Sequence, residues 1–219
     1  MTHSKKALLI GASGLIGSHC LQALLDDVYF AQIEVWVRKP LAIKHIKLKC
    51  IIRDLGDISQ IPATDATHVF CCLGTTIKKA GTQAAFRKVD FDYVVEMAKL
   101  AERSHVTNFT LISSIGANPQ SGNFYLRVKG QMEEAVKSCS IHSIIILRPS
   151  MLLGKRQEFR IGEEVGKALM HALNFLFVGK LRKYRGIQAS AVAKEMIELA
   201  KESSAGIRVV ESDKIRKWQ

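Results

Sequence analysis

The sequence lacks the features of a membrane-spanning or secreted protein. No run reaches the ~18 apolar residues that a transmembrane helix needs. The first residues show no pattern of a secretory signal with its cleavage site. We therefore expect a cytoplasmic protein. The 219 residues, 47% hydrophobic and 24% charged, have the composition of a soluble globular domain.

The motifs of a metal centre are missing as well. The chain contains no C-x-x-C pattern, no H-E-x-x-H pattern and no cluster of histidines. Its five cysteines are an odd number without metal-type spacing: Cys20, Cys50, Cys71, Cys72 and Cys139. We expect reduced, buried thiols and no bound metal.

Acidic residues are few compared with basic ones. The chain has 20 acidic and 32 basic residues, a formal charge of +12. This excess favours an anionic partner, such as a phosphorylated cofactor, an acidic substrate, nucleic acid or a membrane surface. The basic residues that could serve a nucleic acid or a membrane are Lys44, Lys47, Lys49, Lys180, Arg182, Lys183 and Arg185.

No nucleic-acid module with interleaved aromatic residues accompanies these charges, so a solvated basic face is the simpler interpretation. We expect a small-molecule substrate and neither nucleic acid nor a membrane as a partner. A homodimer is the default expectation for the oligomeric state.

Strand-like and helix-like segments alternate along the chain. Apolar runs that suit buried strands cover residues 6–10, 33–37, 49–52, 68–73, 109–112, 143–147 and 207–211. Helical periodicity covers residues 15–25, 82–103, 125–137, 163–176 and 189–201. This order predicts an α/β protein with a doubly wound parallel sheet. We expect one domain over residues 1–219, with residues 150–219 as a small C-terminal lobe on the substrate side.

A glycine-rich turn follows the first predicted strand. Gly11 allows a tight turn, Gly14 allows the backbone to approach a pyrophosphate, and Gly17 allows close packing of helix on strand. The next helix offers free N–H groups to phosphates. A turn that serves packing alone is the alternative interpretation. The residues expected to bind the cofactor here are Gly11, Ser13, Gly14, Leu15, Ile16 and Gly17.

The ends of the next strands add further candidates. Arg38 and Lys39 stand where a carboxylate would hold the ribose 2′-hydroxyl of NAD. A guanidinium suits a 2′-phosphate, so we favour NADP(H) over NAD(H), with a solvated strand-end charge as the alternative. The other expected cofactor contacts are Asp54 and Leu55 at the adenine, and Leu73, Gly74 and Thr75 along the ribose and pyrophosphate.

Tyr125 and Lys129 are one helical turn apart on one face of a predicted helix. A nearby lysine cation stabilises a phenolate, so that the phenol can exchange a proton near neutral pH. Ser114, at the end of a predicted strand, has a hydroxyl that could bond a carbonyl oxygen. A surface contact between Tyr125 and Lys129 is the alternative. With the glycine turn, the set suits hydride chemistry.

These motifs, in this order, resemble the short-chain dehydrogenase/reductase superfamily in its atypical or extended branch. Residues 125–130 and 147–157 are similar to the Tat-interacting-protein group of oxidoreductases and its bacterial relatives. The resemblance implies a Rossmann-type fold and bound NADP(H). It also implies that Tyr125 donates a proton, that Lys129 binds the nicotinamide ribose and that Ser114 orients the substrate.

Two further points follow from the resemblance. Pro149 is expected near the nicotinamide, and Ser113 competes with Ser114 for the serine role. The implied function is an NADP(H)-dependent oxidoreductase that acts on a small carbonyl or alcohol. The alternative is a regulatory protein that senses the redox state by binding NADP(H), with little or no turnover.

Overall fold

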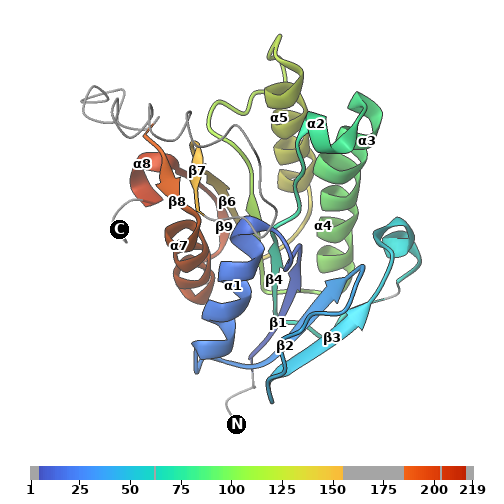
Figure 1. The fold of residues 1–219 in the computed structure, drawn as a ribbon, viewed down its shortest axis with the longest axis vertical. Coiled ribbons are helices and arrows are strands. Elements are labelled where there is room, and N and C mark those ends of the chain that lie inside the picture. Colours follow the sequence, from blue (N-terminus) through green and yellow to red (C-terminus); the bar gives the residue numbers. More distant parts are fainter. Residues whose placement is uncertain (1–4, 62, 155–184, 203, 216–219) are drawn as a thin grey trace.

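The computed structural model describes residues 5–61, 63–154, 185–202 and 204–215, and it shows a parallel sheet between two layers of helices (Figure 1). The sheet strands are β1 (Lys5–Ile10), β2 (Phe30–Val37), β3 (Leu48–Ile52), β4 (His68–Cys71), β5 (Asn108–Ile112), β6 (Ser143–Arg148) and β9 (Gly206–Glu211). A separate two-stranded pair consists of β7 (Leu152–Leu153) and β8 (Ile187–Gln188).

Helices connect most of these strands. The α-helices are α1 (Leu15–Asp26), α2 (Ile77–Ala80), α3 (Gln83–Arg87), α4 (Tyr93–Arg103), α5 (Phe124–Lys137), α7 (Ala189–Glu202) and α8 (Ser212–Ile215). A 3₁₀ helix, η1 (Leu55–Gln60), follows β3, and a π-helical turn, η2 (Lys88–Asp92), lies between α3 and α4.

The strand order of the sheet is β3-β2-β1-β4-β5-β6-β9, with every neighbouring pair parallel. The chain runs outward from β1 to β3 and then returns to place β4 on the other side of β1. The loops after β1 and β4 therefore diverge at the carboxyl edge of the sheet. In doubly wound sheets, this switch point is where a ligand crevice forms.

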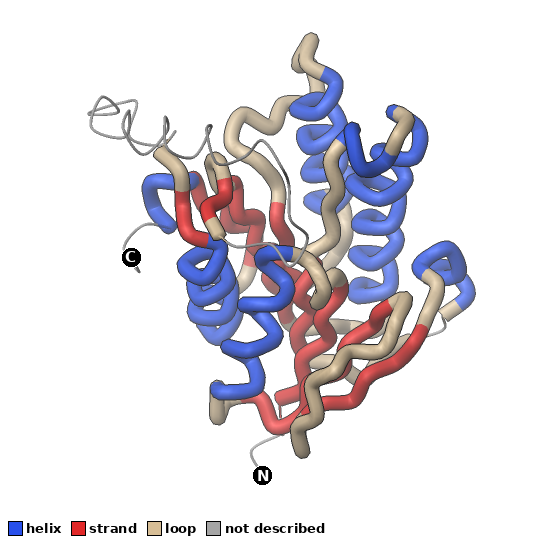
Figure 2. The backbone as a smooth tube through the Cα atoms, viewed as in Figure 1, coloured by secondary structure: helices blue, strands red, loops and turns tan. Residues whose placement is uncertain are grey.

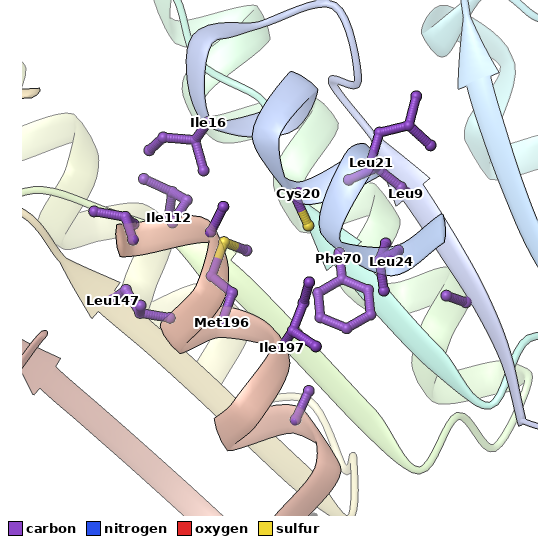
Figure 3. Close-up of a cluster of buried hydrophobic side chains, with 14 of the residues drawn as sticks. Leu9, Ile16, Cys20, Leu21, Leu24, Phe70, Ile112, Leu147, Met196 and Ile197 are labelled. Carbon is purple, nitrogen blue, oxygen red and sulfur yellow. The ribbon is translucent and has the colours of Figure 1, made fainter. Parts of the chain in front are cut away.

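Apolar side chains cover both faces of the sheet, as expected for parallel strands. On one face, Leu9 and Phe70 pack against α1 and α7, through residues such as Leu24 and Ile197 (Figure 3). On the other face, the strands pack against α4 and α5, with Met97 among the fully buried residues. Figure 2 shows the same arrangement, with the strands in red lying between helices in blue. Each fully buried side chain of this size contributes about 1.5–3 kcal/mol.

The predicted fold class is confirmed. All seven strands expected from the sequence occur in the sheet, although β4 ends at Cys71 instead of residue 73. The helix expected over residues 82–103 is present, but η2 interrupts its regular turns. The helix expected over residues 163–176 lies outside the described residues.

The C-terminal part of the chain contributes to the main sheet and its cover. Strand β9 pairs with β6 from Ser143–Gly206 to Arg148–Glu211, and α7 packs beside α1. Residues 155–184 of the expected lobe lie outside the described part, so this lobe stays a prediction. Within the described ranges, no helix has the length and apolarity to cross a membrane.

The cysteines differ from the expectation in their burial. All five are free thiols, but Cys50 is exposed and Cys72 and Cys139 are half-buried. Cys50 is exposed because it lies on β3, the edge strand of the sheet. Across the described ranges, no group of three or more potential metal ligands gathers in one place.

Candidate active site

The turn after β1 forms the floor of the site. Gly11 has a φ of +85°, and an added β-carbon there would stand 2.5 Å from the Cys72 carbonyl oxygen. Only glycine fits this left-handed position beside another backbone. The Gly14 N–H donates to the Gly11 carbonyl at 2.9 Å, and Gly14 then caps α1 without bringing a side chain to the helix end. The first-turn N–H groups of α1 are thus left for another acceptor.

A cavity of ≈ 570 Å³ opens at the carboxyl edge of the sheet, above this turn. It lies at the switch point between β1 and β4, where both strand-end loops contribute to its wall. Twelve residues that the sequence predicted for the site line it: Ser13, Gly14, Leu15, Ile16, Arg38, Leu73, Gly74, Thr75, Ser114, Tyr125, Lys129 and Pro149. Segments far apart in the chain thus converge on one space.

Five predicted residues do not line the cavity: Gly11, Gly17, Lys39, Asp54 and Leu55. Gly11 and Gly17 shape the turn beneath it instead, because their missing β-carbons leave room for the neighbouring backbone. Lys39 is exposed beyond Arg38. The Asp54 carboxylate caps η1 by accepting from the Gly56 N–H at 2.9 Å, and Leu55 packs against the hydrophobic core.

Helix α5 carries the tyrosine and the lysine. Its N-cap, Asn123, accepts a hydrogen bond from the Leu126 N–H, which starts the helix just before Tyr125. Tyr125 is half-buried, and its ring lies 5.6 Å from that of Phe86 on α3. Both Tyr125 and Lys129 reach the cavity, so the spacing of four residues places them on one face as predicted.

Lys129 is buried and ion-paired inside the protein. Its Nζ lies 2.8 Å from Oδ1 of Asp90, and the two side chains are 4% and 1% exposed. Burial on its own would lower the pKa of Lys129. The charges of Asp90 and Tyr125, with the hydrogen bond to Asp90, overcome that effect and raise it above its ordinary value. Lys129 is therefore an ammonium at neutral pH.

Asp90 lines the cavity and is a charged site residue that was not expected from the sequence. It comes from the π-helical turn η2, and its Oδ2 accepts the Thr75 N–H at 2.8 Å. One indication was available, because Phe86, Asp90 and Val94 follow each other at intervals of four residues. An acidic residue thus interrupts an otherwise buried apolar stripe. Its partner could not be identified from the sequence.

The two serines after β5 differ in their surroundings. The Ser114 hydroxyl is half-buried and donates a long hydrogen bond of 3.3 Å to the Ile115 carbonyl. The Ser113 Oγ is buried, and it has no hydrogen-bond partner among the described residues. Both serines line the cavity, so the structure leaves the choice between them open.

Two contacts fix α5 against the rest of the molecule. Gly130 lies against the loop after β5, since a β-carbon at this position would stand 2.2 Å from backbone atoms of Asn118 and Pro119. One turn later, Glu133 receives two hydrogen bonds from Arg148 at the end of β6, at 2.9 and 2.6 Å. Arg148 also bonds Glu211 of β9 at 2.9 Å. Helix α5 is thus attached both to the loop after β5 and to the end of β6.

Comparison with known proteins agrees with this geometry. The model of the NAD(P)H-binding family matches residues 11–171. Protein HTATIP2 of Rattus norvegicus is 34% identical over 175 residues, which cover 78% of this chain and 72% of that protein. Protein FMP52-1, mitochondrial, of Scheffersomyces stipitis is 35% identical over 184 residues, which cover 82% and 77%.

Among solved structures, a UDP-N-acetylglucosamine 4-epimerase from Methanobrevibacter ruminantium M1 shares the fold. The TM-score is 0.69 at 18% identity, over 95% of this chain and 76% of that one. At this level of identity the likeness concerns the fold alone.

The expectation of a cytoplasmic protein is wrong as it was stated. Several FMP52 relatives are named mitochondrial, which points away from a purely cytoplasmic location. The expectation depended on the missing secretory pattern, and that pattern bears on secretion only. The resemblance to the Tat-interacting-protein group, in contrast, is confirmed by HTATIP2. The chain belongs to the NAD(P)H-binding family and has the Rossmann-type fold of a nicotinamide-dependent oxidoreductase, in the group of HTATIP2 and the FMP52 proteins.

Proposed function

We propose that the protein is an NADP(H)-dependent oxidoreductase of the short-chain dehydrogenase/reductase type, which interconverts a small carbonyl compound and its alcohol. One observation carries the proposal. A single cavity is lined both by the glycine turn at the start of α1 and by Ser114, Tyr125 and Lys129. Phosphate-binding groups and proton-transfer groups thus share one space, as hydride transfer to a carbonyl requires.

The residues present fit a dinucleotide. Gly14 brings no side chain to the start of α1, and it lines the cavity together with Ser13. The volume is within the range of roughly 300–1,000 Å³ that is usual for small-molecule and cofactor sites. The turn and the first-turn N–H groups of α1 would hold the pyrophosphate, while Lys129 would hold the nicotinamide ribose. The cofactor, when bound, supplies or accepts a hydride.

The side chains supply the proton and the orientation. In carbonyl reduction, the Tyr125 hydroxyl donates its proton to the carbonyl oxygen, and in alcohol oxidation the phenolate accepts it back. The buried Lys129 ammonium interacts electrostatically with Tyr125, and both side chains line the cavity. The Ser114 hydroxyl donates a hydrogen bond to the same substrate oxygen, and Ser113 is the alternative donor. The Phe86 ring packs beside the Tyr125 ring, with 5.6 Å between the ring centroids.

The preference for NADP(H) is supported by the end of β2. Arg38 lines the cavity there, and the residues that follow Val37 are Arg38 and Lys39 instead of a carboxylate. A guanidinium can form two charge-assisted hydrogen bonds with a 2′-phosphate, whereas it offers nothing comparable to a 2′-hydroxyl.

Turnover of NADPH with a panel of small aldehydes and ketones tests the proposal. We expect Tyr125→Phe to lower kcat about 10²–10⁴-fold, because the proton donor is lost while the ring remains. Tyr93→Phe, on α4 and away from the cavity, is the matched control and should retain wild-type rates. Equal turnover by Tyr125→Phe and the wild type would show that another group donates the proton. Binding of NADPH with no turnover of any compound would favour the regulatory alternative.

A further inference from the structure

The carboxylate of Asp90 links the two halves of the cavity. One oxygen, Oδ1, lies 2.8 Å from the Lys129 Nζ, and the other, Oδ2, accepts the Thr75 N–H at 2.8 Å. Thr75 belongs to the loop after β4 on the dinucleotide side, whereas Lys129 belongs to α5 on the side of the proton donor. A single side chain therefore joins α5 to this loop.

The π-helical turn explains how Asp90 reaches this point. Asp90 is in the middle of η2, where the extra residue per turn shifts the helix surface relative to regular α-helix. The loop after β4 runs close to its carboxylate, since a β-carbon at Gly74 would stand 3.5 Å from Oδ1. Such turns occur frequently at functional sites.

The titratable groups around Lys129 come from three elements. Asp90 faces it from η2, Tyr125 from α5 and the Cys71 thiol from β4. Burial raises the pKa of Cys71 to about 12, so this thiol is neutral. Asp90 is thus the resident anion that balances the Lys129 ammonium. Removing one partner of a buried ion pair leaves the other charge uncompensated in a medium of low dielectric constant.

We propose that Asp90 is the positioning residue of this site: it holds the Lys129 ammonium and the Thr75 amide in fixed relation, so that the lysine stays charged between Tyr125 and the dinucleotide. This inference rests on the proposed function and adds a residue to it. Asp90 acts through Lys129 and the loop, and it neither donates nor accepts the transferred proton. A buried pair with a purely structural role would contribute to stability and leave the pH dependence of the site unchanged.

Asp90→Asn tests the proposal, with Asp92→Asn as the matched control in the same π-helical turn. Asp92 is exposed and lies outside the cavity. We measure kcat and KM for NADPH, and the dissociation constant of NADPH, from pH 6 to pH 10. In Asp90→Asn, the buried lysine loses its counter-ion and gives up its proton more easily. We expect the alkaline limb of kcat to move down by one pH unit or more, while Asp92→Asn keeps the wild-type profile.

The outcomes separate the two proposals. An active wild type with the same pH profile in both variants would overturn the positioning role and leave the oxidoreductase assignment standing. A wild type that binds NADPH without turnover would overturn the assignment, and the positioning role is then decided by binding. The positioning role then requires that, above pH 8, Asp90→Asn binds NADPH about tenfold more weakly than Asp92→Asn does. A wild type that does not bind NADPH at any pH would overturn both.

A second variant covers the case in which Asp90→Asn folds but is too unstable for kinetic measurements. Asp90→Asn combined with Lys129→Met removes both charges, so no unpaired ion remains buried. We expect the midpoint of urea unfolding of the double variant to lie closer to that of the wild type than the midpoint of Asp90→Asn does. A double-mutant cycle measures this coupling between the two residues. If the double variant is no more stable than Asp90→Asn, Lys129 does not depend on Asp90 and the proposal is wrong.

Discussion

The Gly11 carbonyl oxygen stands 2.0 Å from the place where a β-carbon of residue 17 would lie. This contact brings the first turn of α1 directly onto the backbone of the turn after β1. The close approach places the helix start at the cavity, since Leu15 and Ile16 of the first turn line it. Gly17 therefore acts on the site from beneath it, without lining it.

Gly17→Ala should displace the start of α1, because no backbone atom can remain 2.0 Å from a methyl group. We expect a loss of about 3 kcal/mol in the free energy of unfolding, at the upper end of overpacking, together with a loss of NADPH binding. Urea denaturation and fluorescence titration measure the two effects. Gly122→Ala is the control, since an added β-carbon at Gly122 meets nothing within 4 Å. Unchanged NADPH binding by Gly17→Ala would contradict this role of the close contact.

Arg38→Ala should weaken the binding of NADPH more than the binding of NADH. Losing hydrogen bonds from a charged group costs about 1.5–3 kcal/mol, so the affinity for NADPH should fall about 10–100-fold. The affinity for NADH should change less than about twofold, because it has no 2′-phosphate. Titration calorimetry with both cofactors measures the difference. Lys44→Ala, at an exposed residue outside the cavity, is the control, and equal losses for both cofactors would argue against NADP(H) specificity.

Glu133→Gln should lower the free energy of unfolding, because it removes the ion pair that attaches α5 to β6. Glu133 is 1% exposed and carries a two-bond ion pair with Arg148, whose pKa this carboxylate raises above its usual range. Breaking a buried pair costs about 3–5 kcal/mol. We expect the lower end, since Arg148 is partly exposed and keeps Glu211. Chemical denaturation at pH 7 measures the loss. Glu134→Gln, on the exposed side of the same helix, should cost under about 1 kcal/mol.

His68 should lower the stability of the folded protein in mild acid, because its buried ring resists protonation. It is fully buried with its ring packed edge-on against those of Tyr29 and Phe30, and burial lowers its pKa to about 4. The unfolded chain binds a proton at its ordinary pKa of about 6.5, so between these values the unfolded state holds more protons. Stability is therefore complete above pH 6.5 and is lost as the pH falls toward 4, by about 3 kcal/mol.

Melting temperatures between pH 4.5 and pH 7.5 test this dependence on His68. His68→Phe keeps an aromatic ring beside the same neighbours and cannot titrate, so its pH profile should be flatter than that of the wild type. His142→Gln is the control, because His142 is exposed. If His68→Phe and the wild type lost stability in parallel over this range, another group would be responsible for the acid sensitivity.

Sequence patterns predicted the features that depend on neighbours along the chain. The turn of Gly11, Gly14 and Gly17 spans one strand end and one helix start, and Tyr125 and Lys129 are separated by a single turn. Such features are set by local backbone geometry, so their spacing is informative without knowledge of the fold. The alternation of strands and helices likewise restricted the topology to a parallel sheet.

Folding decided which of these residues share a space. Asp54 and Leu55 follow a strand as expected, yet the 3₁₀ helix η1 directs them away from the cavity. Asp90 reaches Lys129 because a π-helical turn breaks the regular periodicity that sequence patterns assume. Contacts between segments distant in the chain depend on how helices pack on the sheet, and no spacing within one segment encodes that packing. Local patterns along the chain were thus enough to infer the parallel sheet, the glycine turn and the tyrosine–lysine pair, whereas the charge beside the lysine results from the packing of η2 against α5.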